Sequence, residues 1–167
     1  VYLQIYKLFD NHTPIKADCG RLCGKACCKG DDSGMYLFPG EKSVYKLLNP
    51  EWARIDVSDF TYKFNGKEKN VPILFCSSEC DRYQRPLACR IFPLTPYINN
   101  NGEFEIIIDP RAKSMCPLAK AYTLGDFNEK FCETVFYIFK FLTKEPHIRE
   151  FVINQSYLLD EYMKFLG

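Results

Sequence analysis

The last third of the chain contains apolar side chains at helical spacing. They recur three and four residues apart, at Phe127, Phe131, Val135, Ile138 and Leu142. Such a period places them on one face of an α-helix. Asp126 and Glu129 have the spacing of a capping box at the start of this helix. Pro146 suits the first turn of a second helix, so we predict a pair of C-terminal helices within residues 126–166.

Shorter regular segments precede this pair. Residues 1–9 and 41–48 have the pattern of short helices. Apolar or alternating segments predict strands at residues 35–38, 52–57, 60–64, 71–75 and 104–108. Asn65-Gly66 predicts a hairpin turn after the third of these strands, and the Gly-Asp-Asp-Ser-Gly sequence at 30–34 predicts a loop turn.

Length and composition indicate one folded domain. The chain has 167 residues, of which 47% are hydrophobic and 26% are charged, and this is enough apolar material for a single core. The predicted fold class is α+β, with one domain over residues 1–167. In it, a cysteine-rich metal-binding core of loops and short strands (residues 19–118) packs on the C-terminal helices.

Charge and hydropathy restrict the partners. A net charge of +1 gives no general attraction for nucleic acid or an anionic membrane surface, and no apolar run reaches the roughly 20 residues that cross a bilayer. The amphipathic segment Val1 to Phe9 lacks the pattern of a secretory signal. We therefore expect no nucleic-acid or membrane partner and a cytoplasmic location.

Nine cysteines carry most of the potential chemistry, and eight of them fall in two groups. The candidate metal ligands are Cys19, Cys23, Cys27, Cys28, Cys76, Cys80, Cys89 and Cys116. An odd cysteine count without an export signal favours thiolates on a metal over a disulfide framework. Thiolates hold zinc and iron, including the iron of iron–sulfur clusters. The predicted cofactor is therefore zinc or iron.

The spacing of the first group restricts its geometry. On one regular helix Cys19 and Cys27 would lie about 12 Å apart along the axis, too far for one mononuclear site. Gly20 and Gly24 disfavour a regular helix and let the chain wrap around a metal. The adjacent side chains of Cys27 and Cys28 are expected to point in different directions, so that one turns away or two metal centres are served. Two four-thiolate sites, one cluster with spare thiols and a bridged binuclear site are all open.

Charged side chains lie between the cysteines. Basic residues there could lower thiol pKa values or could simply be solvated surface charges; they are Arg21, Lys25, Lys29, Arg82, Arg85, Arg90 and Lys113. Glu79, Asp81 and Asp109 could serve as acids, bases or oxygen ligands. Pro86 and Pro93, which flank Cys89, leave room for about one helical turn between them.

Three other residues are expected to stay outside the metal site. Cys132 lies within the predicted helix beside Phe131, where a free cysteine behaves as a small apolar residue. His12 and His147 stand alone at helix edges, where a packing or surface role is favoured over metal ligation.

Two motifs give the chain a family resemblance. Residues 19–28 read C-x-x-x-C-x-x-x-C-C, and residues 80–93 read C-x-x-Y-x-R-P-x-x-C-R-x-F-P, with Cys116-Pro117 following. The chain resembles the YkgJ-like cysteine-cluster family, named for its CxxCxxCC motif, although both gaps in the first motif are one residue longer here. The resemblance covers about residues 19–118 and implies chelation of zinc or iron. Some relatives are described as iron–sulfur proteins, and the flagellin lysine methylases contain a similar cluster.

These observations lead to three functional hypotheses. The first is a metal-binding protein that chelates zinc or iron through its clustered thiolates. The second is an iron–sulfur enzyme of the electron-transfer or methyl-transfer type. The third is a structural metal site that supports a protein-interaction module. The sequence contains no Ser-His-Asp order, phosphate-binding glycine loop or paired carboxylates that would indicate a hydrolase or NTPase.

Overall fold

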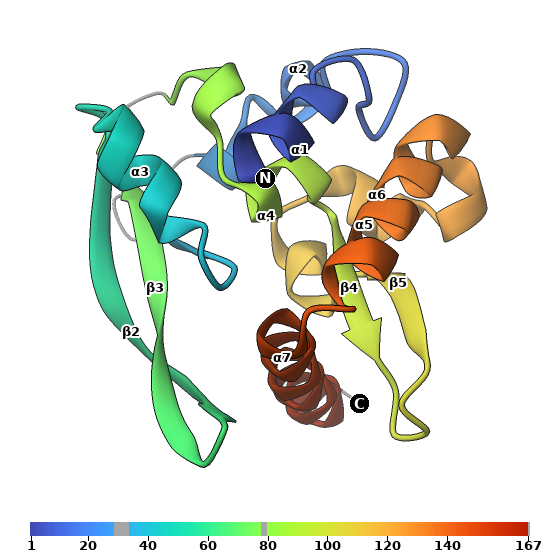
Figure 1. Cartoon of the computed structure of the whole chain (residues 1–167). Coiled ribbons are helices and arrows are strands. Elements are labelled where there is room, and N and C mark those ends of the chain that lie inside the picture. The colour runs from blue at the N-terminus through green and yellow to red at the C-terminus, as the bar shows by residue number, and fades with distance from the viewer. Residues whose placement is uncertain (29–33, 78–79, 167) are drawn as a thin grey trace.

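A computed structural model describes residues 1–28, 34–77 and 80–166, which form an α+β domain (Figure 1). The α-helices are α1 (Tyr2–Leu8), α2 (Gly20–Cys23), α3 (Lys42–Leu48), α4 (Leu87–Ile91), α5 (Pro117–Ala121), α6 (Glu129–Leu142) and α7 (Pro146–Leu166). The short 3₁₀ helices are η1 (Ala26–Cys28), η2 (Arg82–Gln84), η3 (Pro110–Ser114) and η4 (Leu124–Asp126). Lys29, Glu79 and most of the turn predicted at 30–34 lie outside the described residues.

The larger sheet is built on a long β-hairpin. Strand β2 (Ala53–Phe64) pairs with β3 (Lys67–Cys76), and β1 (Gly34–Tyr36) pairs with the other edge of β3, giving the order β1-β3-β2. Asn65 and Gly66 both have positive φ, 51° and 71°, as the tightest hairpin turns require, so the predicted turn is confirmed. The two strands predicted at 52–57 and 60–64 are one strand interrupted by a bulge between Val57 and Thr61.

The second sheet contains a strand that the sequence analysis missed. Strand β4 (Leu94–Ile98) pairs with the predicted strand β5 (Phe104–Ile108), and Pro96 lies opposite Ile106. Proline cannot donate a ladder hydrogen bond and is therefore found mainly in edge strands or at bulges. In a two-stranded sheet both strands are edges, so this sheet accepts Pro96.

The predicted C-terminal helices are confirmed, but the first begins later than expected. Asn128 caps α6, because its side-chain oxygen accepts a hydrogen bond from the backbone N–H of Lys130 at 3.1 Å. The capping box predicted for Asp126 and Glu129 is therefore wrong. Asp126 instead accepts a hydrogen bond from the backbone N–H of Thr123 at 2.8 Å, and these two residues form a capping box at the start of η4.

Helix α7 joins the two sheets, since it packs against both β2 and β4 (Figure 1). Its fully buried Phe151 lies within 6 Å of the rings of Phe38, Phe60 and Tyr62. Phe38 also contacts Phe139 of α6, with ring centroids 5.0 Å apart. These aromatic contacts connect the hairpin, the turn before α3 and both C-terminal helices in one core.

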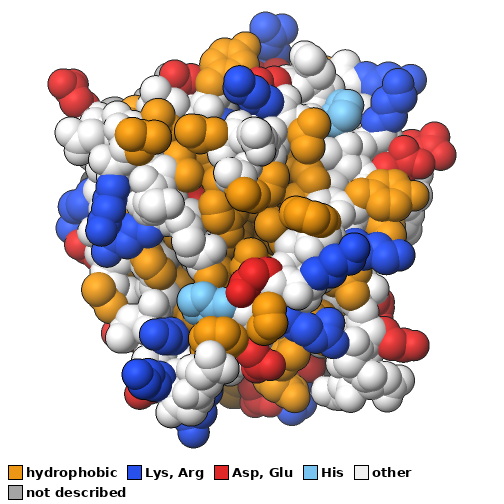
Figure 2. Space-filling view, in the orientation of Figure 1, with side chains coloured by type: hydrophobic (Ala, Val, Ile, Leu, Met, Phe, Trp, Pro, Cys, Tyr) orange, Lys and Arg blue, Asp and Glu red, His pale blue; other side chains and the backbone are white. Residues whose placement is uncertain are grey.

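The surface carries its charges around an apolar centre. Figure 2 shows a band of hydrophobic side chains running down the middle of one face, with basic and acidic side chains mostly toward its margins. Within the part of the chain that the structure describes, no helix combines the length and the apolar character needed to cross a membrane.

A buried carboxylate connects three of these elements. Glu41 is 0% exposed, and its carboxylate accepts hydrogen bonds from the Tyr6 hydroxyl at 2.5 Å and from the backbone N–H groups of Phe38 at 3.0 Å and Leu87 at 2.6 Å. Burial raises the pKa of Glu41, while these donors and Arg90 act in the opposite direction. Glu41 thus holds α1 and the N-terminus of α4 against the turn before α3.

Replacing Glu41 by alanine is expected to destabilise the fold strongly. Glu41→Ala leaves three buried donors without their acceptor, at roughly 1–3 kcal/mol each, so the free energy of unfolding should fall by about 3 kcal/mol or more. Urea denaturation measures this loss. Glu133→Ala, at an exposed position of α6, is the matched control and should change stability by at most about 0.5 kcal/mol. Equal effects of the two substitutions would contradict the role of Glu41.

Candidate metal centre

The first cysteine group leaves the helix as predicted. Helix α2 ends at Gly24, which has a left-handed φ of 57°, and Lys25 follows with φ of 60° before the turn η1. The reversal folds the chain back, so Cys27 and Cys28 do not continue the line of Cys19 and Cys23. The sulfur atoms of Cys27 and Cys28 lie 3.8 Å apart. The expectation that these adjacent side chains diverge is therefore wrong, because the tight backbone of η1 places both sulfurs together.

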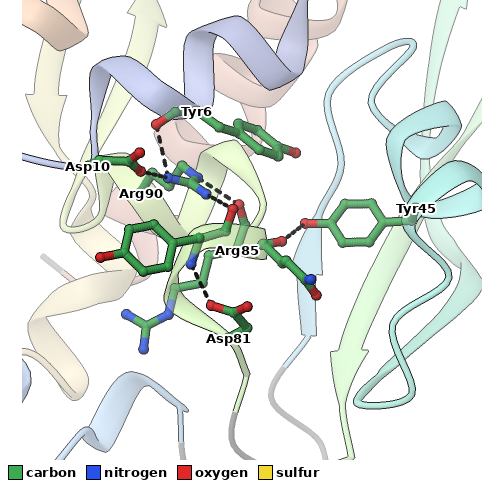
Figure 3. A network of polar contacts seen from close by, with 8 residues as sticks. Tyr6, Asp10, Tyr45, Asp81, Arg85 and Arg90 are labelled. Carbon is green, nitrogen blue, oxygen red and sulfur yellow. Dashed lines mark hydrogen bonds and ion pairs between the residues drawn. The ribbon is translucent and has the colours of Figure 1, made fainter.

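The second group is held in place by Arg90, whose side chain is 5% exposed (Figure 3). Its guanidinium donates hydrogen bonds to the backbone oxygens of Tyr83 at 2.6 Å, Arg85 at 2.8 Å and Tyr6 at 3.0 Å. It also pairs with Asp10 at 3.3 Å and lies 4.4 Å from the centroid of the Tyr6 ring. Arg90 therefore fixes the loop before α4 against α1 and has no thiol among these partners.

Other contacts hold the same loop to the hairpin side of the domain. The Gln84 backbone oxygen accepts from the Tyr45 hydroxyl at 2.8 Å, and its side-chain oxygen accepts from the Trp52 indole at 3.2 Å. Asp81 caps η2 by accepting from the backbone N–H of Tyr83 at 2.9 Å, which gives this acidic residue a structural use. The segment that carries Cys80 and Cys89 is thus held from two sides.

The guanidinium of Arg85 reaches a thiol. Its Nε donates to the Cys80 sulfur at 3.1 Å, and Cys80 is buried. Hydrogen bonds from the thiols of Cys28 and Cys76, together with the charge and hydrogen bond of Arg85, lower the pKa of Cys80 well below that of a free cysteine. These neighbours therefore favour the thiolate form of Cys80.

Four sulfurs form a linked set around Cys80. Cys28 interacts by hydrogen bonding with both Cys27 and Cys80, and this raises the pKa of Cys28. The hydrogen bond between Cys28 and Cys27 lowers the pKa of Cys27 to about 7. Cys76, the last residue of β3, hydrogen bonds with Cys80, and its pKa is raised. We call Cys27, Cys28, Cys76 and Cys80 the four-thiol set.

The other predicted ligands lie around this set. Burial and the neighbouring charges of Cys80 and Cys27 raise the pKa of Cys89 to about 12. Burial raises the pKa of Cys19 to about 11, with further contributions from Cys27, Asp18, Cys116 and Cys23. All eight predicted cysteines are therefore within electrostatic reach of at least one other member. Cys116 is also buried and precedes α5.

Residues predicted to lie outside the site have other partners. The sulfur of Cys132 contacts the backbone oxygen of Leu124 at 3.8 Å, and its side chain is partly buried at the edge of the core. His12 hydrogen bonds with Thr134 at 2.8 Å. His147 hydrogen bonds with Tyr62 and stacks on the Phe64 ring with centroids 4.4 Å apart. His147 thus has the packing role expected for it, whereas His12 lines the smaller of the two cavities beside the thiols, so its exclusion from the metal site stays a prediction.

Two cavities adjoin the thiols. A small one of about 70 Å³ and a larger one of about 400 Å³ are both lined by Cys27, Cys28 and Cys89. Cys76 and Cys80 line the larger cavity, and Cys19 lines the smaller one. The thiols thus form a wall between two spaces, and both spaces give access to the sulfur atoms.

The sulfur positions fit a thiolate metal site in part. In a tetrahedral zinc site with Zn–S bonds of about 2.3 Å, two sulfurs are about 3.8 Å apart, and this is the separation of Cys27 and Cys28. However, no group of three or more Cys, His, Asp or Glu side chains in residues 1–28, 34–77 and 80–166 is arranged to hold a metal ion as it stands. Side-chain rotation would have to bring the remaining sulfurs to the metal.

Comparison of the chain with protein-family models, curated proteins and solved structures finds no match. The resemblance to the YkgJ-like family is therefore a prediction that depends on the two cysteine motifs alone.

Two residues important to this region escaped the sequence analysis. Glu41 anchors the helix that contains Cys89, but its partners Tyr6 and Leu87 are 35 and 46 positions away in the chain. Arg111 lines the larger cavity and pairs with Asp109 at 2.6 Å. The Asp-Pro-Arg sequence at 109–111 was a local signal for the second residue, since an aspartate before a proline often caps a turn.

Replacing Arg85 tests the electrostatic role assigned to it. Arg85→Gln removes the positive charge beside Cys80, so the thiolate is less favoured and the pKa of Cys80 rises. In metal-free, reduced protein, alkylation of Cys80 by iodoacetamide, followed by peptide mass spectrometry, should require a higher pH than in the unmodified chain. Arg82→Gln is the control, because Arg82 pairs with Asp18 at 3.7 Å. An unchanged pH profile in Arg85→Gln would contradict the assignment.

Proposed function

We propose that the chain is a metal-binding protein that chelates zinc or iron through clustered cysteine thiolates. The observation that carries the proposal is the four-thiol set, in which Cys28 and Cys80, from distant segments of the chain, lie close enough to shift each other's pKa. Four thiolates are a complete ligand set for structural zinc, and the sulfur separation of 3.8 Å within the set equals one edge of that tetrahedron. Cys89, Cys19 and Cys116 are nearby candidates for exchange or for a second metal.

The charge distribution supports a cation at this position. The pKa values of Cys80 and Cys27 are lowered and those of Cys28 and Cys76 are raised, so protons are held most firmly by Cys28 and Cys76. A divalent cation would displace those protons and stabilise all four thiolates, and metal binding to cysteine releases protons in this way. Arg85 would then offset part of the remaining negative charge.

An iron–sulfur enzyme is the second candidate, and two observations favour it. More thiols lie near the four-thiol set than one mononuclear ion requires. In addition, the cavity of about 400 Å³ lined by these thiols has the size of a small-molecule site, which a purely structural ion would not need. An electron-transfer or methyl-transfer reaction is the class that this alternative implies.

Metal content after anaerobic purification tests the proposal directly. We expect at least about one zinc or iron atom per chain by mass spectrometry, because the four-thiol set is a full ligand set. A colourless protein with zinc would support the chelating role, whereas a brown protein with iron and inorganic sulfide would support the iron–sulfur alternative. A folded chain with neither metal, also after anaerobic reconstitution, would overturn both.

Serine substitutions separate the metal ligands from the other cysteine. Cys80→Ser removes the central sulfur, so bound metal should fall by more than about tenfold, and thermal stability should fall if the metal contributes folding energy. Cys132→Ser is the matched control and should retain full metal content. Loss of the fold in Cys80→Ser without any assignable activity of the unmodified chain would favour the structural alternative. Equal metal content in both variants would refute ligation by Cys80.

A further inference from the structure

The cavity of about 400 Å³ is formed by separate elements that meet beside the four-thiol set. Strands β1 and β3 supply one part of its wall, and η1, α4, β4, η3 and α7 supply other parts. Most of the lining is apolar, with Phe38, Ile73, Leu74, Ile91 and Leu94 among its residues. A concave, mainly apolar space of this size with a few polar groups is typical of small-molecule sites.

The polar part of the lining is an ion pair and a neutral hydrogen bond. Asp109 accepts from the backbone N–H and Nε of Arg111 at 2.9 Å each and from Nη2 at 2.6 Å. The Gln155 amide donates to the Thr95 hydroxyl at 2.8 Å. A guanidinium has five N–H donors, and the Arg111 side chain is 34% exposed. Arg111 can therefore serve Asp109 and still donate to an oxygen atom of a ligand.

The charges around this space decide which ligand it favours. Asp109 and Arg111 neutralise each other, so this ion pair in the lining offers no net charge to balance that of an anion or a cation. A charged ligand would also lose its hydration against the apolar lining without a compensating partner. A neutral molecule does not have this cost.

We infer that this cavity binds a neutral small molecule with an apolar body and one hydrogen-bond acceptor, such as a carbonyl oxygen, which Arg111 holds beside the cysteine thiols. The role of this molecule as a substrate rests on the function proposed above. The lining residues that the structure describes are protein side chains and not a metal, so binding can be measured with and without metal.

The fluorescent naphthalene ketone prodan is a suitable probe, because it is neutral, apolar and has a single carbonyl group. We expect saturable one-to-one binding with blue-shifted emission in the full chain. Ala88→Phe fills the cavity from α4, since Ala88 lines it, and should weaken prodan binding by at least about tenfold. Asp109→Asn/Arg111→Met removes the donors together with their buried partner and should weaken binding by roughly fivefold or more.

The exposed pair Arg54–Asp56, 3.0 Å apart on β2, provides the matched control. Arg54→Met/Asp56→Asn makes the same chemical change away from the cavity and should bind prodan like the unmodified chain. Anionic anilinonaphthalenesulfonate should bind at least about tenfold more weakly than prodan, and equal affinity would overturn the neutral ligand class.

Metal content and circular dichroism of each sample separate the two proposals. Loss of prodan binding in folded Ala88→Phe and in the Asp109/Arg111 variant, with metal retained, supports the cavity site. A metal-loaded chain that does not bind prodan would overturn this inference and leave the metal proposal intact. If Ala88→Phe does not fold, the test is the comparison of prodan binding between the Asp109/Arg111 variant and its control, Arg54→Met/Asp56→Asn. Equal prodan binding by these two variants overturns the inference.

Discussion

The carboxylate of Glu41 is the constraint on which the arrangement around the thiols depends. It joins α1 through Tyr6, the turn before α3 through Phe38, and the first amide of α4 through Leu87. Helix α4 has five residues, too few to be stable on its own, so its position is determined by such external contacts. Because α4 contains Cys89 and is continuous with the Cys80 loop, the placement of the second cysteine group follows from a residue that touches no sulfur.

Two arginines of the second motif, Arg85 and Arg90, have different roles. Arg90 is almost fully buried and satisfies backbone oxygens on α1 and on the loop before α4, so it stabilises the scaffold. Arg85, five residues earlier, donates to the Cys80 sulfur and acts on the chemistry of the site. A Lys at position 90 could not make this set of contacts, because the planar guanidinium directs several donors at once. The motif thus encodes both the support of the site and its electrostatics.

Sequence periodicity predicted the elements that depend on local patterns. The C-terminal helices, the helix α1 and the Asn65-Gly66 turn are determined by spacing and by φ preferences within a few residues. The strand β4 was missed because its five residues include Pro96. A proline fits a strand only at an edge, at its first residue or at a bulge, and whether β4 is an edge is a property of the tertiary fold. The shared metal site of the two cysteine groups stays a prediction, although Cys28 and Cys80 lie close enough to shift each other's pKa.

Tertiary contacts account for what the sequence could not provide. The role of Glu41 depends on contacts with Tyr6 and Leu87, which are separated from it by 35 and 46 positions in the chain. The close sulfur pair at Cys27 and Cys28 depends on a 3₁₀ turn that follows two left-handed residues, Gly24 and Lys25. Spacing alone leaves the local backbone undetermined, so the expected divergence of these side chains was wrong. The cavity beside the thiols likewise comes from elements far apart in the sequence that only the fold brings together.

Electrostatics connects the sulfurs, the arginine and the cavity. Two unit charges about 4 Å apart repel by roughly 4 kcal/mol at an effective dielectric constant of 20, so neighbouring thiolates cannot all be ionised without compensating cations. The pKa values of the thiols shift in opposite directions, since Arg85 and the neighbouring thiols lower the pKa of Cys80 whereas the pKa values of Cys28 and Cys76 are raised. One guanidinium cannot neutralise four thiolates, whereas a divalent metal ion together with Arg85 would come within one charge of doing so. In the adjoining apolar space the Asp109–Arg111 pair has no net charge, and the cost of burying a charge there supports a neutral molecule as the proposed ligand.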